Sequence, residues 1–381
     1  MAEVVIPEPK TVVDEPFSIV GELSQWQLIR IRFKRNKLAV GGLIGLIIMY
    51  ILVFLGPFLA PSEFMTNNND YTFGGPSNIT FIGPDGRFGL QPYMHPMTTV
   101  LNRETLKFDM VLDKTKRIPI KFFVEGDPIV LFGFIHTDIH LFGVDPPHRV
   151  YLMGADAVGR DMLARLLVGG QISMTIGLVG VALSIIFGSI LGTISGFYMG
   201  LADDIIQRLI EVIMSFPTVP LWAALAAALP PISGSFTPMH RYFLITVVLS
   251  LIGWTGLARQ IRAKVMAYRG ADFVQASLAA GASDMHAVFV HMLPNAASHI
   301  IVTAALSIPG MILGETALSF LGLGIVPPMV SWGALMRDAQ KVTVIIQHPW
   351  LMLPGVAVII AVLLFSFLGD GIRDAMDPYS I

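Results

Sequence analysis

The sequence predicts an all-α polytopic membrane protein with six transmembrane helices and a small β-containing insert outside the membrane. Of its 381 residues, 54% are hydrophobic and only 14% are charged, whereas soluble domains have roughly 45–50% apolar and about 25% charged residues. Six apolar segments approach the length of about 20 residues that a helix needs to cross a bilayer. A long polar segment, residues 61–150, separates the first of them from the rest. The net charge of −2 gives no general attraction to nucleic acid, and the absence of cysteine excludes disulfides, thiolate metal sites and cysteine nucleophiles.

Residues 1–37 are predicted to form a cytoplasmic N-terminal tail and an interfacial helix. The leading segment is too long, too acidic and too rich in proline for a cleavable signal peptide. Ser24 is a suitable N-cap for the helix, which carries a basic cluster of Arg30, Arg32, Lys34, Arg35 and Lys37. Since basic residues beside a span remain on the cytoplasmic side, the N-terminus is predicted to be cytoplasmic. The first transmembrane helix is predicted at residues 38–60.

Residues 61–150 are predicted to form an extracytoplasmic insert that contains strands. The pieces Leu106–Leu112 and Ile118–Val124 have the composition of strands. In the second half of the insert, His136, Asp138 and His140 recur at every second residue, which in a strand would direct all three to one face. A metal site is conceivable there, but no fourth ligand is evident, so polar packing is the preferred interpretation and no metal site is predicted.

Residues 151–370 are predicted to form a core five-helix domain, followed by a cytoplasmic C-terminal tail at 371–381. A row of glycines at every fourth position, Gly188, Gly192 and Gly196, would allow close helix packing. Residues 201–207 are predicted to be a tight polar turn. The predicted spans are Gln171–Met199, Arg208–Leu229, Tyr242–Ala263, Ala296–Leu321 and Pro349–Leu368. Six crossings return the C-terminus to the cytoplasm.

Three residues within these spans are candidates for lining or gating a pathway. Pro217 and Pro220 interrupt the third span, where proline frees backbone carbonyls or kinks the helix. Glu315 is a carboxyl group in an otherwise apolar run, which makes it a functional candidate. A simple kink and a structural, hydrogen-bonded glutamate are the alternatives.

The moderately polar segment Asp272–Asn295 lies between two long apolar segments, at the predicted cytoplasmic end of spans four and five. Its alanines favour a helix with a small-residue surface, which Gly281 would break and Pro294 would close. This shape suits docking into another protein, and an ordinary interfacial loop helix is the alternative. The strand-then-GK[ST] pattern of a phosphate-binding loop is absent from the chain, so no nucleotide site is predicted in it.

Several stretches resemble permeases of the oligopeptide/dipeptide/nickel-type ABC importers. MGADAVGRDMLARLLVGGQISM resembles the conserved block before the core spans of that family, and Asp272–Asn295 resembles its EAA loop, with Leu293, Pro294 and Asn295 following. ETALSFLGLGIVPPMVSWGALM and the final span are similar to the last external loop and last helix. The resemblance covers about residues 150–378, and the basic leader with span one fits the second-permease type. Gln275 stands where the family commonly has glutamate, and the insert is longer than in many relatives.

The resemblance implies the ABC importer permease fold in a bacterial or archaeal cytoplasmic (inner) membrane. It implies a non-catalytic subunit that forms a heterodimer with a second homologous permease and works with two ATPase subunits and an extracytoplasmic substrate-binding protein. ATP and Mg would be bound by the ATPase subunits, and this chain would bind no cofactor. The residues implied in ATPase coupling are Gln275, Ala276, Ser277, Ala279, Ala280, Gly281, Asp284, Leu293 and Pro294.

The substrate class stays open at this point. Peptides or similar small solutes are expected, and oligosaccharides, opines or metal chelates are the alternatives within the family. A stand-alone secondary transporter is a rival function, although no chain of Asp, Glu or His runs through the spans. A membrane enzyme that uses His136, Asp138 and His140 is a third hypothesis, which lacks a paired nucleophile and base.

Overall fold

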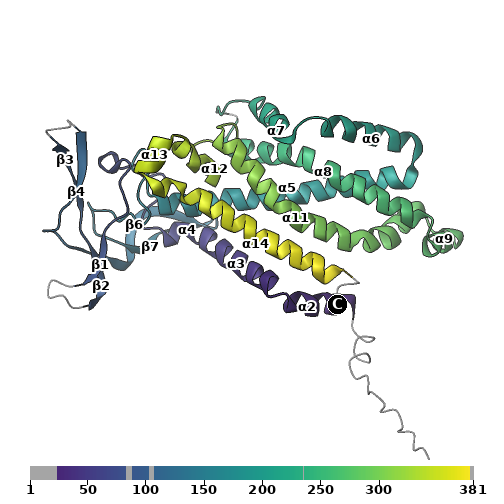
Figure 1. The fold of residues 1–381 in the computed structure, drawn as a ribbon, viewed down its shortest axis with the longest axis horizontal. Coiled ribbons are helices and arrows are strands. Elements are labelled where there is room, and N and C mark those ends of the chain that lie inside the picture. The colour runs from purple at the N-terminus through teal and green to yellow at the C-terminus, as the bar shows by residue number, and fades with distance from the viewer. Residues whose placement is uncertain (1–23, 83–87, 103–106, 235, 378–381) are drawn as a thin grey trace, which may run out of the picture.

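The computed structural model describes residues 24–82, 88–102, 107–234 and 236–377. Residues 1–23 of the predicted N-terminal tail and 378–381 of the predicted C-terminal tail lie outside the described residues. Figure 1 shows a long bundle of helices with a group of short strands at one end. The helices are α2 (Gln25–Arg35), α3 (Lys37–Phe54), α4 (Gly56–Leu59), α5 (Met162–Tyr198), α6 (Gly200–Met214), α7 (Thr218–Ala227), α8 (Pro238–Arg269), α9 (Asp272–Ala279), α10 (Asp284–His286), α11 (Leu293–Phe320), α12 (Trp332–Leu335), α13 (Val342–Gln347) and α14 (Leu353–Met376).

The predicted number of membrane crossings agrees with the helices. In the described chain, five helical segments are long and apolar enough to cross a membrane, and α6 with α7 makes a sixth if the bent pair is one span. The five segments are Lys37–Phe54, Met162–Tyr198, Pro238–Arg269, Asp284–Phe320 and Pro349–Met376. The all-α class with a β-containing insert is therefore confirmed.

The third span differs from the prediction. Residues 201–207, predicted as a polar turn, are helical and belong to α6. The chain turns earlier, at Met199 and Gly200, whose φ angles are 55° and 56°. The predicted continuous span at 208–229 is two helices bent by 90°. Pro217 is the N-cap of α7, and proline at this point cannot continue the preceding helix because it has no N–H group.

A tertiary ion pair explains why the polar segment is helical. Asp203 of α6 accepts from Nε and Nη2 of Arg262 in α8, at 2.6 and 2.5 Å, and from the hydroxyl of Ser195 in α5. Charged residues that suggest a loop in the sequence are thus satisfied by neighbouring helices.

The glycine row predicted to allow close packing lies between α5 and α8. A Cβ atom on Gly192 would lie 2.5 Å from the carbonyl oxygen of Ala258, and one on Gly196 would lie 2.6 Å from that of Arg262. The prediction of close packing is confirmed, because no side chain fits between these backbones.

In its described residues, the insert has seven short strands in three antiparallel groups. β1, β2 and β5 form one sheet, β3 pairs with β4, and β6 pairs with β7. The strands are β1 (Ile79–Ile82), β2 (Phe88–Met94), β3 (Met97–Asn102), β4 (Lys107–Leu112), β5 (Ile118–Pro119), β6 (Lys121–Leu131) and β7 (Ile135–Gly143). Both predicted strands are present, with Leu106 outside the described residues and the second one divided at Ile120.

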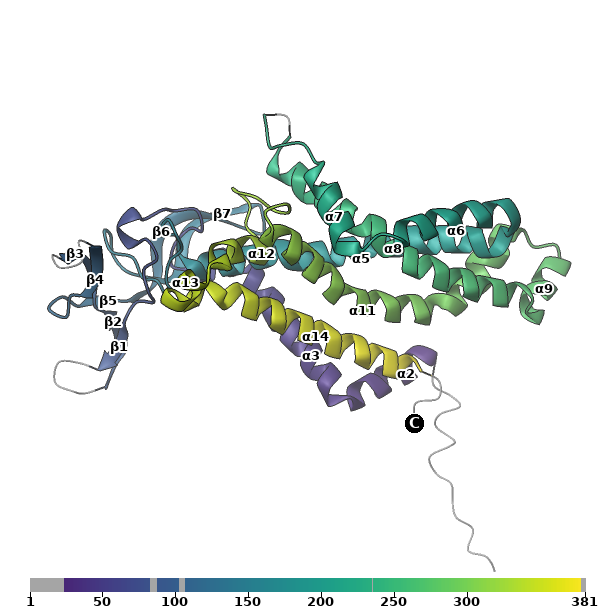
Figure 2. The same ribbon diagram turned by 45° about the horizontal axis from the view of Figure 1, so that its top comes forward.

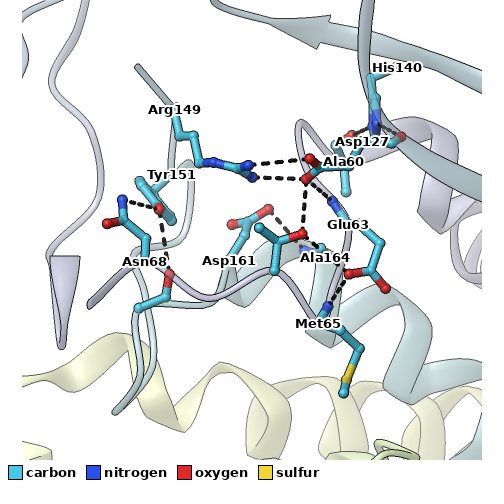
Figure 3. Close-up of polar contacts among 12 residues, drawn as sticks. Ala60, Glu63, Met65, Asn68, Asp127, His140, Arg149, Tyr151, Asp161 and Ala164 are labelled. Atoms are coloured by element: carbon cyan, nitrogen blue, oxygen red, sulfur yellow. Dashed lines mark hydrogen bonds and ion pairs between the residues drawn. The ribbon is translucent and has the colours of Figure 1, made fainter. Parts of the chain in front are cut away.

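Polar contacts attach the β6–β7 hairpin to the chain segments that enter and leave the membrane (Figure 3). Asp127 of β6 accepts two hydrogen bonds from Arg149, at 2.9 and 3.2 Å, and another from the backbone N–H of Glu63. Burial alone would raise the pKa of Asp127, but the hydrogen bonds and positive charge of Arg149 hold this pKa below its usual value. The hairpin is thereby joined to the segment that follows α4 and to the segment that leads to α5.

The start of α5 is fixed by a buried carboxyl group. Asp161 is its N-cap and accepts from the backbone N–H groups of Leu163 and Ala164, both at 3.2 Å. Burial raises the pKa of Asp161 to about 7, and these hydrogen bonds partly oppose the rise. Helix capping by a side-chain oxygen of this kind stabilises the end of a helix by about 0.5–2 kcal/mol.

Candidate functional site

The segment at residues 272–295 lies at the end of the helical bundle farthest from the strands (Figure 2). It contains α9, a turn at Gly281, the single turn α10 and the π-helical turn η2 (Ala287–Met292), and it leads into α11. The short helix, its break at glycine and the proline at the start of the next helix are all present. We call this segment the α8–α11 loop.

Gly281 ends α9 in a left-handed conformation. Its φ angle is +91°, its N–H donates to the carbonyl of Leu278, and the N–H of Ala282 donates to that of Ser277. This pair of bonds is the Schellman arrangement, in which glycine is preferred because it has no Cβ atom. A Cβ built on Gly281 meets nothing within 4 Å. The glycine is therefore required by the backbone, and its outer side is open.

The inner side of the α8–α11 loop is seated on the bundle. Val274 of α9 is fully buried in a cluster with Ile261 and Val265 of α8, and Met292 joins it from η2. Burying an apolar side chain of this size stabilises the contact by about 1.5–3 kcal/mol. The buried side chain of Val274 thus attaches α9 to α8.

Gln275 also makes a contact within its own chain. Its Nε2 donates a hydrogen bond of 2.7 Å to the carbonyl oxygen of Arg269, the last residue of α8. The side chain thus satisfies one of the carbonyl groups that a helix end leaves free. Gln275 is exposed, but part of its hydrogen-bonding capacity ties α9 to α8.

The outer side of the loop presents most of the residues predicted to contact an ATPase. Ser277 and Leu293 are half-buried, and the exposed ones are Gln275, Ala276, Ala279, Ala280, Gly281, Asp284 and Pro294. The prediction omitted Phe273 and Met285, which are exposed large apolar side chains of the same segment. A signal for Phe273 was present, because two successive apolar residues, Phe273 and Val274, cannot both face the same side of a helix.

An apolar groove of about 550 Å³ runs along α5 beside the α8–α11 loop. Its walls include Ile186, Ile190 and Phe289. Among the described side chains, the hydroxyls of Ser189 and Thr193 in this groove are buried and have no hydrogen-bond partner. Most buried hydroxyl groups in proteins have a hydrogen-bond partner, so two unpaired hydroxyls in one apolar groove are unusual.

The candidate pathway residues differ in position. Pro217 and Pro220 are both exposed at the bend between α6 and α7. Glu315 of α11 is fully buried, so it lines no open cavity in this conformation. Its carboxylate accepts from the hydroxyls of Ser173 and Ser319, at 2.8 and 2.6 Å.

The two serines extend the Glu315 contacts to the segment after α11. The hydroxyl of Ser319 accepts from the N–H of Ile325, and that of Ser173 accepts from the N–H of Trp332. Glu315 therefore holds both ends of residues 325–332 against α5 and α11. We refer to these four contacts as the Glu315 network.

The three residues of the His–Asp–His pattern have different surroundings. His136 and Asp138 of β7 are exposed, whereas His140 is buried. The ring nitrogens of His140 contact the carbonyl oxygens of Ala60 and Asp127, at 2.6 and 2.9 Å. Within the described residues, no group of three or more potential metal-binding side chains converges. His140 joins the hairpin to the residue that follows α4 (Figure 3).

Two family models match the chain. Residues 184–379 match the binding-protein-dependent transport system inner membrane component. Residues 24–76 match the N-terminal TM domain of oligopeptide transport permease C. The first match includes α6 to α14 and the α8–α11 loop, and the second includes α2, α3 and α4.

Curated proteins are similar over most of their own length. The oligopeptide transport system permease protein OppC of Haemophilus influenzae is 36% identical over 65% of this chain and 76% of that protein. A putative peptide permease protein of Brucella ovis is 37% identical over 74% of this chain and 91% of that protein. The di/tripeptide transport system permease protein DppC of Pseudomonas aeruginosa is 36% identical over 60% and 72%.

A solved structure, the MetNI methionine ABC transporter in inward-facing conformations, matches with a TM-score of 0.43 and 17% identity, covering 57% of this chain and 98% of that chain. The family models and the curated relatives carry the assignment without it. This chain belongs to the family of inner-membrane components of binding-protein-dependent transport systems, as a permease subunit of the oligopeptide- and dipeptide-type ABC importers.

Proposed function

We propose that this chain forms half of the translocation pathway of a peptide importer and is driven by ATPase subunits through the α8–α11 loop. The observation that carries the proposal is the two-sided construction of that loop. One side is packed on the bundle through Val274, and the other presents small exposed residues around Gly281. Small residues at an exposed helix allow another protein to approach closely.

The loop would act by differential docking. A contact shifts a two-state membrane element only if its free energy differs between the two states of the ATPase dimer. Gln275 bonds to the end of α8, and the π-helical turn η2 leads directly into α11. Since π-helical turns often occur at functional sites, we infer that movement of α9 repositions α8 and α11 together.

The proposed orientation places both termini and the α8–α11 loop in the cytoplasm. The basic cluster of α2 directly precedes the first span, and basic residues of this kind remain on the cytoplasmic side. α2 also meets the end of α14, because Arg32 donates to the carbonyl oxygen of Asp377 at 2.5 Å. A common location for α2 and the end of α14 fits an even number of crossings.

The second permease is proposed to pack on the apolar groove beside α5. A helix that carries a polar side chain would satisfy the hydroxyls of Ser189 and Thr193 as it covers the groove. Hydrogen bonds between helices of this kind are common in membranes.

The strands β1 to β5 of the insert, between residues 79 and 119, are proposed as the platform for the extracytoplasmic binding protein.

Peptides are the proposed substrates because the similar curated proteins are named as peptide permeases. Oligosaccharides or other solutes of the same importer class are the alternative. The binding protein that co-purifies with the complex would distinguish these classes through its bound ligand.

Reconstitution tests the proposed function. The chain assembled with a second permease, ATPases and binding protein in liposomes should transport only with ATP. Transport by the purified chain alone, driven by an ion gradient, would show instead a secondary transporter.

Site-specific cross-linking tests the contact with the ATPase. The chain has no cysteine, so Ala279→Cys, an exposed position, gives a single reactive site. It should cross-link to the ATPase, and the matched variant Phe88→Cys in the insert should not. Equal cross-linking of both variants, or none from Ala279→Cys, would contradict the assignment of the loop.

A further inference from the structure

The β6–β7 hairpin carries a set of exposed aromatic side chains that no part of the described chain covers. Phe122 and Phe123 are 62% and 68% exposed, and at the tip Phe132 and Phe134 are 52% and 72% exposed. Val130 and Ile135 beside the tip are also exposed. We call these six residues the hairpin patch. They form two groups, with Phe122 and Phe123 at the open end of the hairpin and the other four residues at its tip. Scattered apolar residues are normal on a surface, whereas groups of large ones mark an interaction site.

The backbone of the hairpin is strained where the patch is formed. Phe123 and Phe132 both have φ angles of +54°, a region in which a bulky residue is an outlier. At the tip, Phe132 is followed by Gly133 with φ +82°, a pair of left-handed residues for which Asn-Gly is the usual sequence. Burial within the chain does not offset this strain, since both rings are exposed. Strained positions of this kind concentrate at functional sites.

The open end of the hairpin, with Phe123 of the hairpin patch, lies beside the end of the first span. Rings of Phe123 and of Phe58 in α4 are 6.3 Å apart, and α4 continues the path of α3 after one residue. In Figure 1 the hairpin lies next to α4, between the other strands and the helices. Among the described strands, β6 and β7 are therefore the ones packed against the helix that ends the first span.

The lipid-facing surface of α3 leads up to the hairpin patch. The large apolar side chains of α3 that remain exposed in the chain are Leu38, Leu43, Ile44, Ile47, Ile48, Ile51 and Leu52. In a chain of this family, an exposed face of this composition on a span contacts lipid. The exposed Glu125, His136 and Asp138 of the hairpin oppose deep insertion, so contact at the level of the lipid headgroups fits the charges.

We propose that the hairpin patch docks on the outer leaflet of the membrane and holds the insert at the bilayer surface. The aromatic rings enter the boundary between headgroups and acyl chains, where such side chains anchor membrane proteins. The polar bonds of Asp127 and His140 (Figure 3) fix the hairpin to Ala60 at the end of α4 and to Arg149 in the segment that leads to α5. The membrane contact thereby sets the height and tilt of the remaining strands.

Single-cysteine variants of the full chain in liposomes test this proposal. A bimane probe is attached to Phe134→Cys, to Phe123→Cys and, as a control of equal exposure, to Phe88→Cys in β2, where Phe88 is 74% exposed. Probes at 134 and 123 should be quenched by nitroxide-labelled phosphatidylcholine, be protected from aqueous iodide and show blue-shifted emission. The probe at 88 should be quenched by iodide alone.

The same measurement is repeated with the second permease and with the binding protein added. Lipid quenching at 134 and 123 that persists in all three samples supports the proposal. Iodide quenching at 134 and 123 equal to that at 88 would overturn it. Protection that arises only with the second permease, or only with the binding protein, would also overturn it, since the patch would then be a protein interface.

Discussion

Replacing Gly281 with aspartate perturbs the proposed ATPase contact most directly. Gly281 has a φ angle of +91°, and a Cβ atom there meets nothing within 4 Å. The new side chain therefore projects away from the bundle. A non-glycine residue in the left-handed region costs about 1–2 kcal/mol, which is small against the roughly 5–15 kcal/mol by which a typical domain is stable. The chain should still fold and insert.

The larger effect falls on docking. A carboxylate without a partner must be desolvated when another protein closes over it, at an effective cost of several kcal/mol. A loss of about 3 kcal/mol weakens the contact roughly 100-fold, because each 1.4 kcal/mol is a factor of ten. We expect Gly281→Asp to abolish transport and to disconnect ATP hydrolysis from stimulation by the binding protein.

The assay is ATP-driven uptake and binding-protein-stimulated ATPase activity in proteoliposomes, with the amount of assembled complex measured in parallel. Gly281→Asn is the matched control, since asparagine has the same size, tolerates the left-handed region and carries no charge. It should retain more transport than Gly281→Asp. Wild-type transport by Gly281→Asp would refute the coupling role, and equal loss in both variants would attribute the effect to bulk or backbone and not to charge.

Three further predictions concern the stability of the helical bundle. Gly192→Ala should destabilise the solubilised chain by about 1–3 kcal/mol through overpacking, because its Cβ would lie 2.5 Å from the carbonyl oxygen of Ala258. The control Gly256→Ala, where the space is open, should be neutral or slightly stabilising. The order of the two melting temperatures checks this prediction. Glu315→Ala should lower the free energy of unfolding by about 2–3 kcal/mol, because it leaves buried hydroxyls without their acceptor, and Glu315→Gln should lower it less. Residues 321–332 should also be proteolysed faster in the alanine variant. An unchanged melting temperature would contradict the Glu315 network. Folding raises the pKa of Asp161 from 3.8 to about 7, so its contribution to the free energy of unfolding is present below pH 3.8 and is lost as the pH rises through 7. Stability should therefore fall between about pH 4 and 7. Asp161→Asn keeps a capping oxygen and should flatten that slope, and an identical slope in the variant would contradict the assignment.

The sequence by itself determined the features that depend on local composition. Apolar length located every span but the third, since a bilayer requires about 20 apolar residues per helix. Gly281 and Pro294 marked the ends of helices in the α8–α11 loop, because glycine permits a left-handed backbone and proline has a fixed φ and no N–H group. Ser24 was also correct as an N-cap, and it forms a capping box with Gln27. These signals act within a few residues of each other, so they can be read without a fold.

Tertiary structure decided the features that depend on partners far apart in the sequence. Residues 201–207 are helical because Arg262 satisfies Asp203, and the 90° bend before α7 depends on where the two helices pack. Gln275 caps α8, and Glu315 is enclosed by hydroxyls from two helices. A buried polar group needs a hydrogen-bond partner. Helix packing decides which partner is within reach, and the local pattern of residues does not predict that packing.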